Sequence, residues 1–563
     1  MVISLPARRR YLFISNPATG QINPLLAVME ELALRGNQAI LASSESVYHK
    51  FQKLQARMGY TVQPESTPSD EYLKRCPLVF VSLGSCDVMD DYTNKAVALT
   101  DQFHELCRSN PGDIWGWLST FTELVPGASP EYRDIVFRIR DLCEKLDADM
   151  LLVDNFSPFA VDAARLTKRP FIETSPGASS AVASNVNFLT NPLPMSGGRK
   201  AGAGIYTLLR NIVFMYIWLK FIFLNPWPIR RRRFRKEVLG LKPVDVICDS
   251  VMTPTPGMLP QQIATITFNV ASMDIYPKEA YDKSVYFVGP CFSTKGGKLP
   301  STRAPSSPVY ASRRAALESS PSTPSTPSLS LTPSRLEKEM LNVQSTSEDP
   351  VKVWMDQAMQ DGKRVLYINM GSIFFYNRQD YDNIVESLKM LHKLAPNALI
   401  LWKVPKLPYE VQPIPPLEEA NLPFYIRREY WIPDVEVVLQ HPALAVFMHH
   451  GGGNSYNEAI AHGIPQFCVS QWVDTHDIGL YVQHSGVGLW ADKSPRFDPV
   501  DISTKLAMLI KDEHNTFQHV ALSWQLKAAQ AGGTTGACDI IESLVTSYKF
   551  EGGSSKAPMP SAF

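Results

Sequence analysis

The 563-residue chain lacks three features that would define its surroundings: paired cysteines, an excess of charge of one sign, and an apolar leader. No two of its eight cysteines form a C-x-x-C pair or a metal-ligand spacing, which predicts scattered reduced thiols. The 55 basic residues balance the 55 acidic ones, so the overall charge does not point to nucleic acid. The first residues contain no apolar core of a secretory signal. We therefore expect a protein of a reducing, cytoplasmic compartment.

Strands and helices alternate along both halves of the chain, which predicts two doubly wound α/β domains with parallel sheets. The length exceeds what one core supports, and 45% apolar with 20% charged residues is a globular composition. One long segment is dense in Ser, Pro and Thr and cannot bury enough apolar surface to fold. The expected units are a first domain over 1–292, a disordered linker over 293–348, a second domain over 349–525, C-terminal helices over 526–548 that pack back toward the first domain, and a disordered tail over 549–563.

The chain is organised around residues 431–477, where a short apolar strand leads into a glycine loop and a helix. The strand AVFM (445–448) is followed by two histidines and three glycines (451–453), and the helix is expected directly after them. Glycines let backbone N–H groups approach an oxygen closely, and the start of a helix favours negative charge. The pattern therefore predicts a phosphate site. Ser455 and Glu458 also have the spacing of a capping box, which would explain both residues without a ligand.

Several further elements stand at fixed spacings around this loop. W-I-P-D (431–434) is followed by V-L-x-H, by H-G-G-G-N-S-x-x-E-A (450–459), by G-x-P and by D-T (474–475). Their order resembles the nucleotide-sugar signature of UDP-dependent glycosyltransferases, the glucosyl- and glucuronosyltransferase-like enzymes with a GT-B fold. The resemblance implies two Rossmann-like domains that face each other across a cleft. The acceptor would bind to the first domain and the UDP-sugar to the second.

The resemblance also assigns roles to individual residues. Trp431 would stack on the uracil, Glu458 would hold the ribose hydroxyls, and Asp474 would bond the sugar hydroxyls. The residues that would take the diphosphate are Ser372, from a G-S element after an earlier strand, and His450, Gly452, Asn454 and Ser455. Two donor positions depart from the family pattern. Asp434 stands in place of a Gln near the nucleoside, and Thr475 in place of the Gln that helps to read the sugar.

The start of the chain is also similar to this family, except at the catalytic position. A strand, a loop and a helix expected to begin at Asn23-Pro24 correspond to the family's strand, G-H-x-x-P loop and helix. The family's general-base His falls at Gln21, and glutamine can orient a hydroxyl but cannot take its proton. Three accounts stay open: another base, an acceptor such as an amine or acidic phenol that needs little deprotonation, or lost catalysis.

Asp154 is the candidate for the missing base. It follows the apolar run MLLV, so it is expected at the carboxyl end of a buried strand. The family places here an Asp that orients its catalytic His, and in this chain it would act on the acceptor directly or through water. Burial can raise the pKa of such a carboxyl toward a useful value. An Asp at a strand exit is also a common turn former, and Asp162 on the next helix is expected to be structural.

Residues 204–226 are the most apolar part of the chain, and the basic run Arg230–Lys236 follows them. Arg210, Asn211 and Lys220 interrupt the apolar run, which leaves too short a stretch for a membrane-spanning helix. Its aromatic side chains would bury against a lipophilic acceptor or a bilayer surface, and the arginines would meet phosphate headgroups. A buried helix with a solvated basic end is the alternative.

The resemblance implies inverting transfer of a sugar, glucose by preference, from a UDP-sugar to a hydroxyl, amine or phenol. The acceptor would be a lipophilic terpenoid, sterol or polyketide, as for a secondary-metabolite glucosyltransferase. No metal or further cofactor is expected, because N–H groups, the helix dipole and His450 would stabilise the leaving diphosphate. We expect peripheral contact of 204–236 with an intracellular membrane and no contact with nucleic acid. Two other classes stay open: a UDP-sugar-binding protein without transferase activity, because of Gln21, and a membrane-attached scaffold.

Overall fold

The structure of the chain is a computed structural model. The residues that it describes are 9–66, 68–84, 100–108, 118, 128–197, 204–244, 246, 249–250, 256–293, 349–372, 374–491 and 497–550. Apart from Ser293, the predicted linker (293–348) lies outside these residues. The predicted tail (549–563) also lies outside them, apart from Lys549 and Phe550, which are helical.

The first domain is built on a parallel sheet with the strand order β3-β2-β1-β4-β5-β6-β7. Its strands are β1 (Arg10–Ile14), β2 (Gln38–Ser43), β3 (Leu78–Ser82), β4 (Met150–Asp154), β5 (Phe171–Ser175), β6 (Gln262–Thr267) and β7 (Val285–Phe287). Its helices are α1 (Thr19–Leu34), α2 (Tyr48–Arg57), α3 (Asp70–Arg75), α5 (Thr100–Arg108), α7 (Pro130–Leu146), α8 (Pro158–Thr167), α9 (Ile205–Leu224) and α10 (Pro226–Glu237), with short 3-10 turns η1 (Glu45–Val47), η2 (Ser179–Val182) and η3 (Lys278–Ala280).

The second domain repeats this plan with the strand order β10-β9-β8-β11-β12-β13, again all parallel. Its strands are β8 (Arg364–Asn369), β9 (Ala398–Lys403), β10 (Ile426–Glu429), β11 (Leu444–His449), β12 (Gln466–Cys468) and β13 (Gly488–Trp490). Its helices are α13 (Pro350–Gln360), α14 (Arg378–Leu394), α15 (Val435–Gln440), α16 (Gly453–Ala461), α17 (Val473–His484), α18 (Pro499–Lys511) and α19 (Thr516–Gln530), and α20 (Gly533–Phe550) follows. The predicted fold of two doubly wound α/β domains is confirmed.

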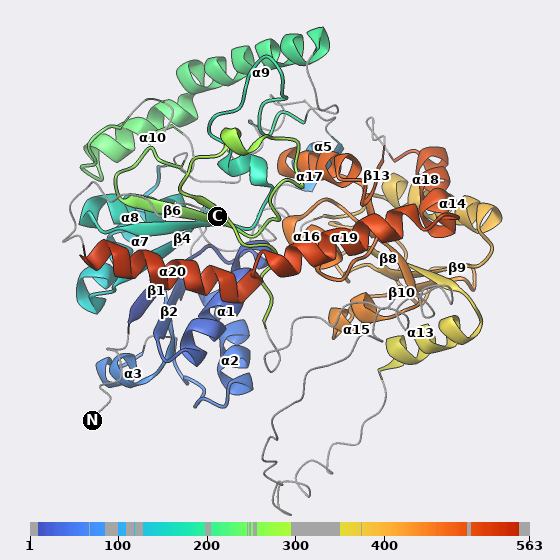
Figure 1. Cartoon of the computed structure of the whole chain (residues 1–563), viewed down its shortest axis with the longest axis horizontal. Helices are drawn as coiled ribbons and strands as arrows, with labels where there is room; N and C mark the ends of the chain where they lie inside the picture. The colour runs from blue at the N-terminus through green and yellow to red at the C-terminus, as the bar shows by residue number, and fades with distance from the viewer. Residues whose placement is uncertain are drawn as a thin grey trace, which may run out of the picture.

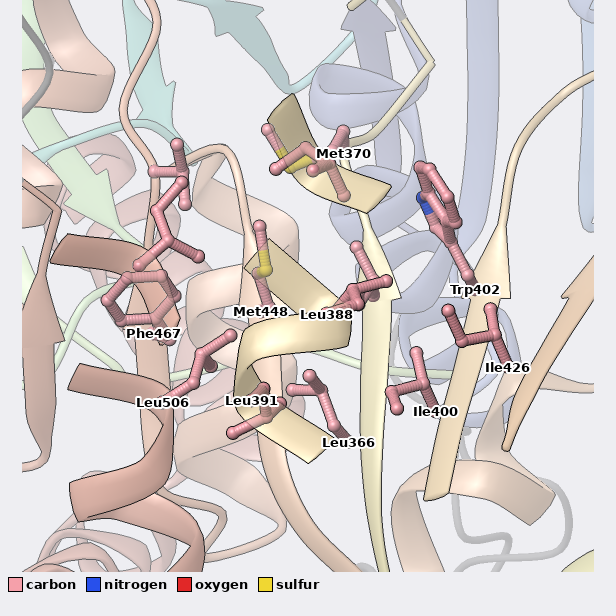
Figure 2. Close-up of a cluster of buried hydrophobic side chains, with 14 of the residues drawn as sticks. Leu366, Met370, Leu388, Leu391, Ile400, Trp402, Ile426, Met448, Phe467 and Leu506 are labelled. Atoms are coloured by element: carbon pink, nitrogen blue, oxygen red, sulfur yellow. The ribbon is translucent and has the colours of Figure 1, made fainter. Parts of the chain in front are cut away.

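Apolar clusters fill both faces of each sheet, beneath the helices that cover it (Figure 1). Figure 2 shows one face in the second domain, where Leu366 and Met448 on the strands meet Leu388 and Leu391 on α14 and Leu506 on α18. These side chains are fully buried. The hydrophobic residues of the strands thus fix the helices against the sheet, and the polar carboxyl ends of the strands stay available for a site.

A separate apolar cluster joins the two domains. Met273 and Tyr276 of the first domain pack in it with Tyr456, Tyr481 and Trp490 of the second. All five side chains are buried. The two sheets therefore meet through an apolar interface, which holds the loops at their carboxyl ends in a defined relation.

The last helix, α20, returns to the first domain and packs on α1 (Figure 1). Its Cys538 and Ile541 belong to the apolar cluster of the first domain. Arg35 at the end of α1 forms ion pairs with Asp539 at 2.6 Å and Glu542 at 2.8 Å. The chain thus completes the core of its first domain with its final helix.

Helix α1 begins earlier than the sequence predicted. It starts at Thr19, so Pro24 lies inside the helix and not at its first position. The Ala18 carbonyl accepts from the N–H groups of Gln21 and Ile22, which closes the first turn without a side-chain cap. Proline removes only one helical hydrogen bond here. The consequence is that Gln21 lies in the first turn of α1.

The apolar run forms one unbroken helix, α9, so the prediction that it is too short to span a membrane is wrong on length. The 20-residue helix is long and apolar enough by composition, with a mean hydropathy of 1.6. The basic run forms part of α10, and only some of its arginines are exposed. Arg231 and Arg235 are buried in the first domain, whereas Arg230 and Arg233 are exposed.

Candidate active site

The carboxyl ends of three neighbouring strands of the second sheet stand side by side. Asn369 at the end of β8 pairs in register with Lys403 on β9 and with His449 on β11. Ligands of doubly wound domains bind beyond this edge. The predicted donor residues Ser372 and His450 follow two of these strands directly, and Ser372 is exposed.

The start of α16 is open to an anion. The helix begins at Gly453, and its N-cap, Gly452, offers no side chain to the first turn. Ser455 lies inside the helix, so the alternative that Ser455 and Glu458 form a capping box is wrong. Backbone N–H groups of an uncapped first turn need an outside acceptor. A phosphate at this position would meet these N–H groups and the positive end of the helix dipole.

Two histidines shape the loop before α16. The Gly451 N–H donates to His449 Nδ1 at 3.0 Å, and His449 Nε2 bonds Gln466 Oε1 at 2.9 Å. This pair of bonds fixes a neutral tautomer, because Nδ1 accepts and Nε2 donates. Burial lowers the pKa of His449 to about 4. Gly451 has φ +86°, and an added Cβ would lie 2.6 Å from the Thr475 carbonyl oxygen, so glycine is required here.

His450 is enclosed between two glycines. An added Cβ would lie 2.4 Å from its ring at Gly371 and 2.5 Å from it at Gly452. Burial lowers the pKa of His450 to about 3, and the neighbouring His449 lowers it too. Its Nδ1 is buried and has no hydrogen-bond partner in the described structure. The ring is therefore neutral, and it can offer a hydrogen bond but not a charge to a diphosphate.

The predicted nucleoside residues lie around an exposed aromatic ring. Trp431 is 67% exposed, and Lys403 Nζ stands 4.4 Å from the centre of its ring. Glu458 is half-buried; burial raises its pKa to about 7, against the opposing charges of His462 and Lys403. An exposed indole with a carboxyl group nearby can take a flat base and ribose hydroxyls. Sequence reasoning missed Lys403, because only the register of β9 brings it here.

Asp434 and Thr475, the two departures from the family pattern, both take part in helix caps. Asp434 caps α15 and accepts from the Glu436 N–H at 3.1 Å. The Thr475 hydroxyl accepts from the N–H groups of Gln471 at 2.9 Å and Trp472 at 2.8 Å. Each side chain is thus occupied by the backbone before any ligand binds.

Asp474 lies in the first turn of α17, next to the Thr475 cap. Burial raises its pKa to about 6, although the N–H groups of Asp474 and Thr475 lower it. Asp477, one turn later, accepts from the Ser180 hydroxyl at 2.6 Å and from the Met195 N–H at 2.8 Å. Because Ser180 and Met195 belong to the first domain, this helix start is fixed against both domains.

Asp154 ends β4, as the sequence predicted, but it lies beneath the surface of the site. Its Oδ2 accepts from Asn16 Nδ2 and from the Ser157 hydroxyl, both at 2.9 Å. Burial raises its pKa to about 7, against these and backbone hydrogen bonds that lower it. Gln21 Oε1 is buried without a hydrogen-bond partner in the described structure. Asn16 was not predicted from the sequence. Its side chain donates to Asp154, the residue that orients the catalytic His in the family that this chain resembles.

The structure brings the donor loop of the second domain against the acceptor side of the first. Asn454 Nδ2 donates to the Thr19 carbonyl at 3.3 Å, two residues before Gln21. An added Cβ at Gly453 would lie 2.3 Å from the Pro176 carbonyl oxygen. The start of α16 and the first turn of α1 therefore lie side by side at the domain boundary.

Asp162, by contrast, has no part in this site. It is fully buried on α8, where Arg235 Nε donates to it at 2.9 Å and the Tyr132 hydroxyl at 2.8 Å. Its predicted structural role is confirmed.

Comparison with known proteins agrees with this geometry. Residues 415–537 match the erythromycin biosynthesis protein CIII-like C-terminal domain. The chain is 24% identical to erythritol-mannosyl-transferase 1 of Mycosarcoma maydis, over 94% of this chain and 90% of that protein. It is 25% identical to UDP glycosyltransferase 9 of Catharanthus roseus, over 34% of this chain and 40% of that protein.

Among solved structures, the chain is similar to the glycotransferase of kitacinnamycin, with a TM-score of 0.56, 16% identity and coverage of 96% of this chain and 100% of the other. A second similar structure is CalG4, the calicheamicin glycosyltransferase, with a TM-score of 0.50, 14% identity and coverage of 96% and 99%. At these identities the likeness concerns the fold.

Two parallel-sheet domains of this kind, together with the similar proteins, define a glycosyltransferase of the GT-B class. The matched C-terminal domain, the relatives and the signature in residues 431–477 support a member of the UDP-glycosyltransferase family.

Proposed function

We propose that the enzyme transfers a sugar, glucose by preference, from a UDP-sugar to a hydroxyl group of a lipophilic small molecule. The open first turn of α16 carries this proposal, because it offers uncapped N–H groups where a diphosphate is expected. An acceptor oxygen attacks C1 of the sugar from the face opposite the diphosphate. The C1–oxygen bond to UDP breaks, UDP leaves with the electron pair, the acceptor loses its proton, and the anomeric centre is inverted.

The donor would be held by residues of the second domain. Trp431 supplies an exposed ring for the uracil, and Glu458 faces the ribose hydroxyls. The neutral His450 ring offers a hydrogen bond to the diphosphate, with Ser372 nearby at the β8 exit. Since the Thr475 hydroxyl already serves the turn before α17, we assign recognition of the sugar to Asp474.

The acceptor would be activated without a histidine. Gln21 Oε1, which has no partner in the described structure, can accept a hydrogen bond from the acceptor hydroxyl and orient it. Asp154 is buried but has a pKa of about 7, so it can hold a proton at neutral pH. Because Asn16 and Ser157 already bond its Oδ2, we assign Asp154 an action through water and not direct contact.

We propose no metal in this reaction, because the helix start and His450 supply the hydrogen bonds that a leaving diphosphate needs. Within the described ranges no group of three His, Cys, Asp or Glu side chains could hold a metal ion. The expected site of action is cytoplasmic, with peripheral contact of 204–236 with an intracellular membrane. Loss of turnover with a chelator, restored by magnesium, would contradict the metal-free reaction.

Transfer of mannose is a second candidate. The erythritol-mannosyl-transferase of Mycosarcoma maydis is similar over 94% of this chain, a far larger share than the plant relatives cover. Its name favours a mannosyl donor and a small polyol acceptor. An assay of nucleotide release distinguishes the two candidates. Its rate with nucleotide-activated mannose and erythritol is compared with its rate with UDP-glucose and sterols, terpenoids or phenols.

The test is calorimetric titration with UDP followed by assay of UDP release. Trp431→Ala should weaken UDP binding about tenfold, since stacking on an aromatic ring contributes roughly 1–3 kcal/mol per base. Phe424→Ala is the matched control, because Phe424 is an exposed aromatic residue of the same domain. If the protein binds UDP but releases no UDP from any UDP-sugar, it is a binding protein and not a transferase. If it does not bind UDP at all, the proposal is overturned.

A further inference from the structure

Helix α9 presents its apolar side to the outside. Ile205, Leu209, Ile212, Tyr216, Leu219 and Phe223 follow one another at spacings of three or four residues, and they are 41% to 75% exposed. Such spacing puts them on one face of the helix. Figure 1 shows α9 along the outer edge of the first domain. A helix on the surface of a protein in water normally has the opposite arrangement.

The side of α9 that faces the protein is polar in its first half. Asn211 is fully buried: its Nδ2 donates to the carbonyls of Phe188 at 2.7 Å and Asn191 at 2.8 Å, and its Oδ1 accepts from the Leu193 N–H at 3.1 Å. Phe221, near the other end, packs in a small apolar cluster. The helix is thus attached to the domain at its middle and at its end.

We propose that α9 lies in the surface of a lipid bilayer, with its apolar face among the acyl chains and its polar side toward the protein. A spanning orientation would strip Asn211 of its three hydrogen bonds, because the helix would have to leave the domain. An in-plane helix buries only its apolar face, to a depth of about 5–10 Å, and this needs no rearrangement.

Charge favours a bilayer over a second copy of the chain. From Ile205 to Lys236 the sequence has eight basic residues and no acidic one. Arg230, Arg233 and Lys236 are exposed on α10, which follows α9 after a break at Asn225. Each cation near an anionic membrane contributes roughly 1 kcal/mol. A two-fold contact between copies would instead bring these like charges together.

The same attachment connects the bilayer with the active site. Arg210 donates to the carbonyl of Ser196 at 2.6 Å, next to Met195, whose N–H donates to Asp477 on α17. The segment before α9 that contains Met195 and Ser196 therefore contacts both α9 and the end of α17 where the sugar is expected. This inference rests on the proposed function for one point, that the acceptor is lipophilic. Such an acceptor would enter from the bilayer beside this segment.

The test is flotation of the full chain with vesicles of phosphatidylcholine alone or with 30% phosphatidylserine. The wild type should float with the mixed vesicles, and Ile212→Glu combined with Tyr216→Glu should reduce the bound fraction at least about tenfold. Arg230→Gln combined with Arg233→Gln should reduce binding to the mixed vesicles only, and most at low salt. Leu526→Glu on α19, an exposed leucine (54%) of the second domain, is the matched control.

A wild type that stays unbound with both vesicles would overturn the inference. A dimer in solution that Ile212→Glu and Tyr216→Glu dissociate would overturn it too, in favour of a second copy. UDP affinity, measured on the same samples, should be equal in all of them. Failure of vesicle binding with intact UDP release refutes only the membrane contact, whereas lost UDP binding in the wild type refutes the proposed function.

Discussion

Gly453 of the second domain lies against the Pro176 carbonyl of the first. A Cβ at Gly453 would stand 2.3 Å from that oxygen and 3.2 Å from Gly177 Cα. Both contacts are with backbone atoms, which cannot turn aside as a flexible side chain can. The first residue of α16 therefore lies directly against the backbone of the first domain.

Gly453→Ala should separate the domains slightly while it leaves the helix N–H groups in place. UDP affinity should stay within about threefold, but transfer should fall about 100-fold, because a displacement of about 1 Å between donor and acceptor has that effect. Titration with UDP and a single-turnover assay measure the two quantities. Gly177→Ala is the matched control, since a Cβ there meets nothing within 4 Å. Equal turnover in both variants would argue against this contact as a determinant of transfer.

Binding of UDP-glucose should weaken as the pH falls from 8 to 6. Above about 7 the Glu458 carboxyl is ionised and can accept from both ribose hydroxyls; below that pKa it carries a proton. His450, with a pKa of about 3, stays neutral throughout and adds no opposing trend. Both phosphates of UDP-glucose are esterified, so the charge of the ligand is constant in this range. Calorimetry at several pH values measures the effect. Glu458→Gln should bind weakly and keep only the smaller pH dependence near pH 6 that Asp474, with a pKa of about 6, contributes.

Gln21→His should speed transfer to hydroxyl acceptors, but only about tenfold. A general base contributes roughly 10²–10⁴-fold when an acid residue orients it, and here Asn16 occupies the Asp154 oxygen that would do so. Initial rates with an alcohol measure the gain, and an amine acceptor, which needs less help, should show little change. An unchanged rate with the alcohol would mean that another group already takes the proton.

Arg235→Met should destabilise the first domain by about 3–5 kcal/mol, because it removes the shorter of the two ion pairs of the buried Asp162 and leaves only Arg165 at 3.6 Å. Urea unfolding measures the loss, and adding Asp162→Leu should restore part of it. Arg233→Met is the matched control, since Arg233 is exposed on the same helix and should change stability by less than about 0.5 kcal/mol. Equal losses in the two single variants would show that the buried pair is not the cause.

The sequence predicted best where fold and site are local in the chain. The exit of β11, the glycines and α16 follow one another within a few residues, so periodicity and punctuation were sufficient to place them. The predicted start of α1 was wrong. Pro24 is a residue type that often stands first in a helix, and a cap formed by the Ala18 backbone cannot be recognised from the sequence. Strand β6 (Gln262–Thr267) was not predicted at all, although its alternating Ile and Thr residues are typical of a strand.

The site residues that could not be predicted from the sequence are brought to the site by the pairing of strands that are distant in the chain. Asn16 meets Asp154 because β1 and β4 are neighbours, although 138 positions separate the two residues. Lys403 reaches Trp431 through the register of β9. Thr475 was predicted as a sugar ligand by analogy with glutamine, whereas a shorter hydroxyl at a helix start binds the adjacent backbone instead.

The return of α20 to the first domain also affects how the polypeptide is made. Domains synthesised first usually fold first on the ribosome. Here Ile541 and Val545 fill a core whose strands begin at Arg10, so the earliest sheet to emerge lacks this part of its cover until α20 has been synthesised. The nascent first half would expose apolar surface throughout that interval, which makes this enzyme a candidate client of ribosome-associated chaperones.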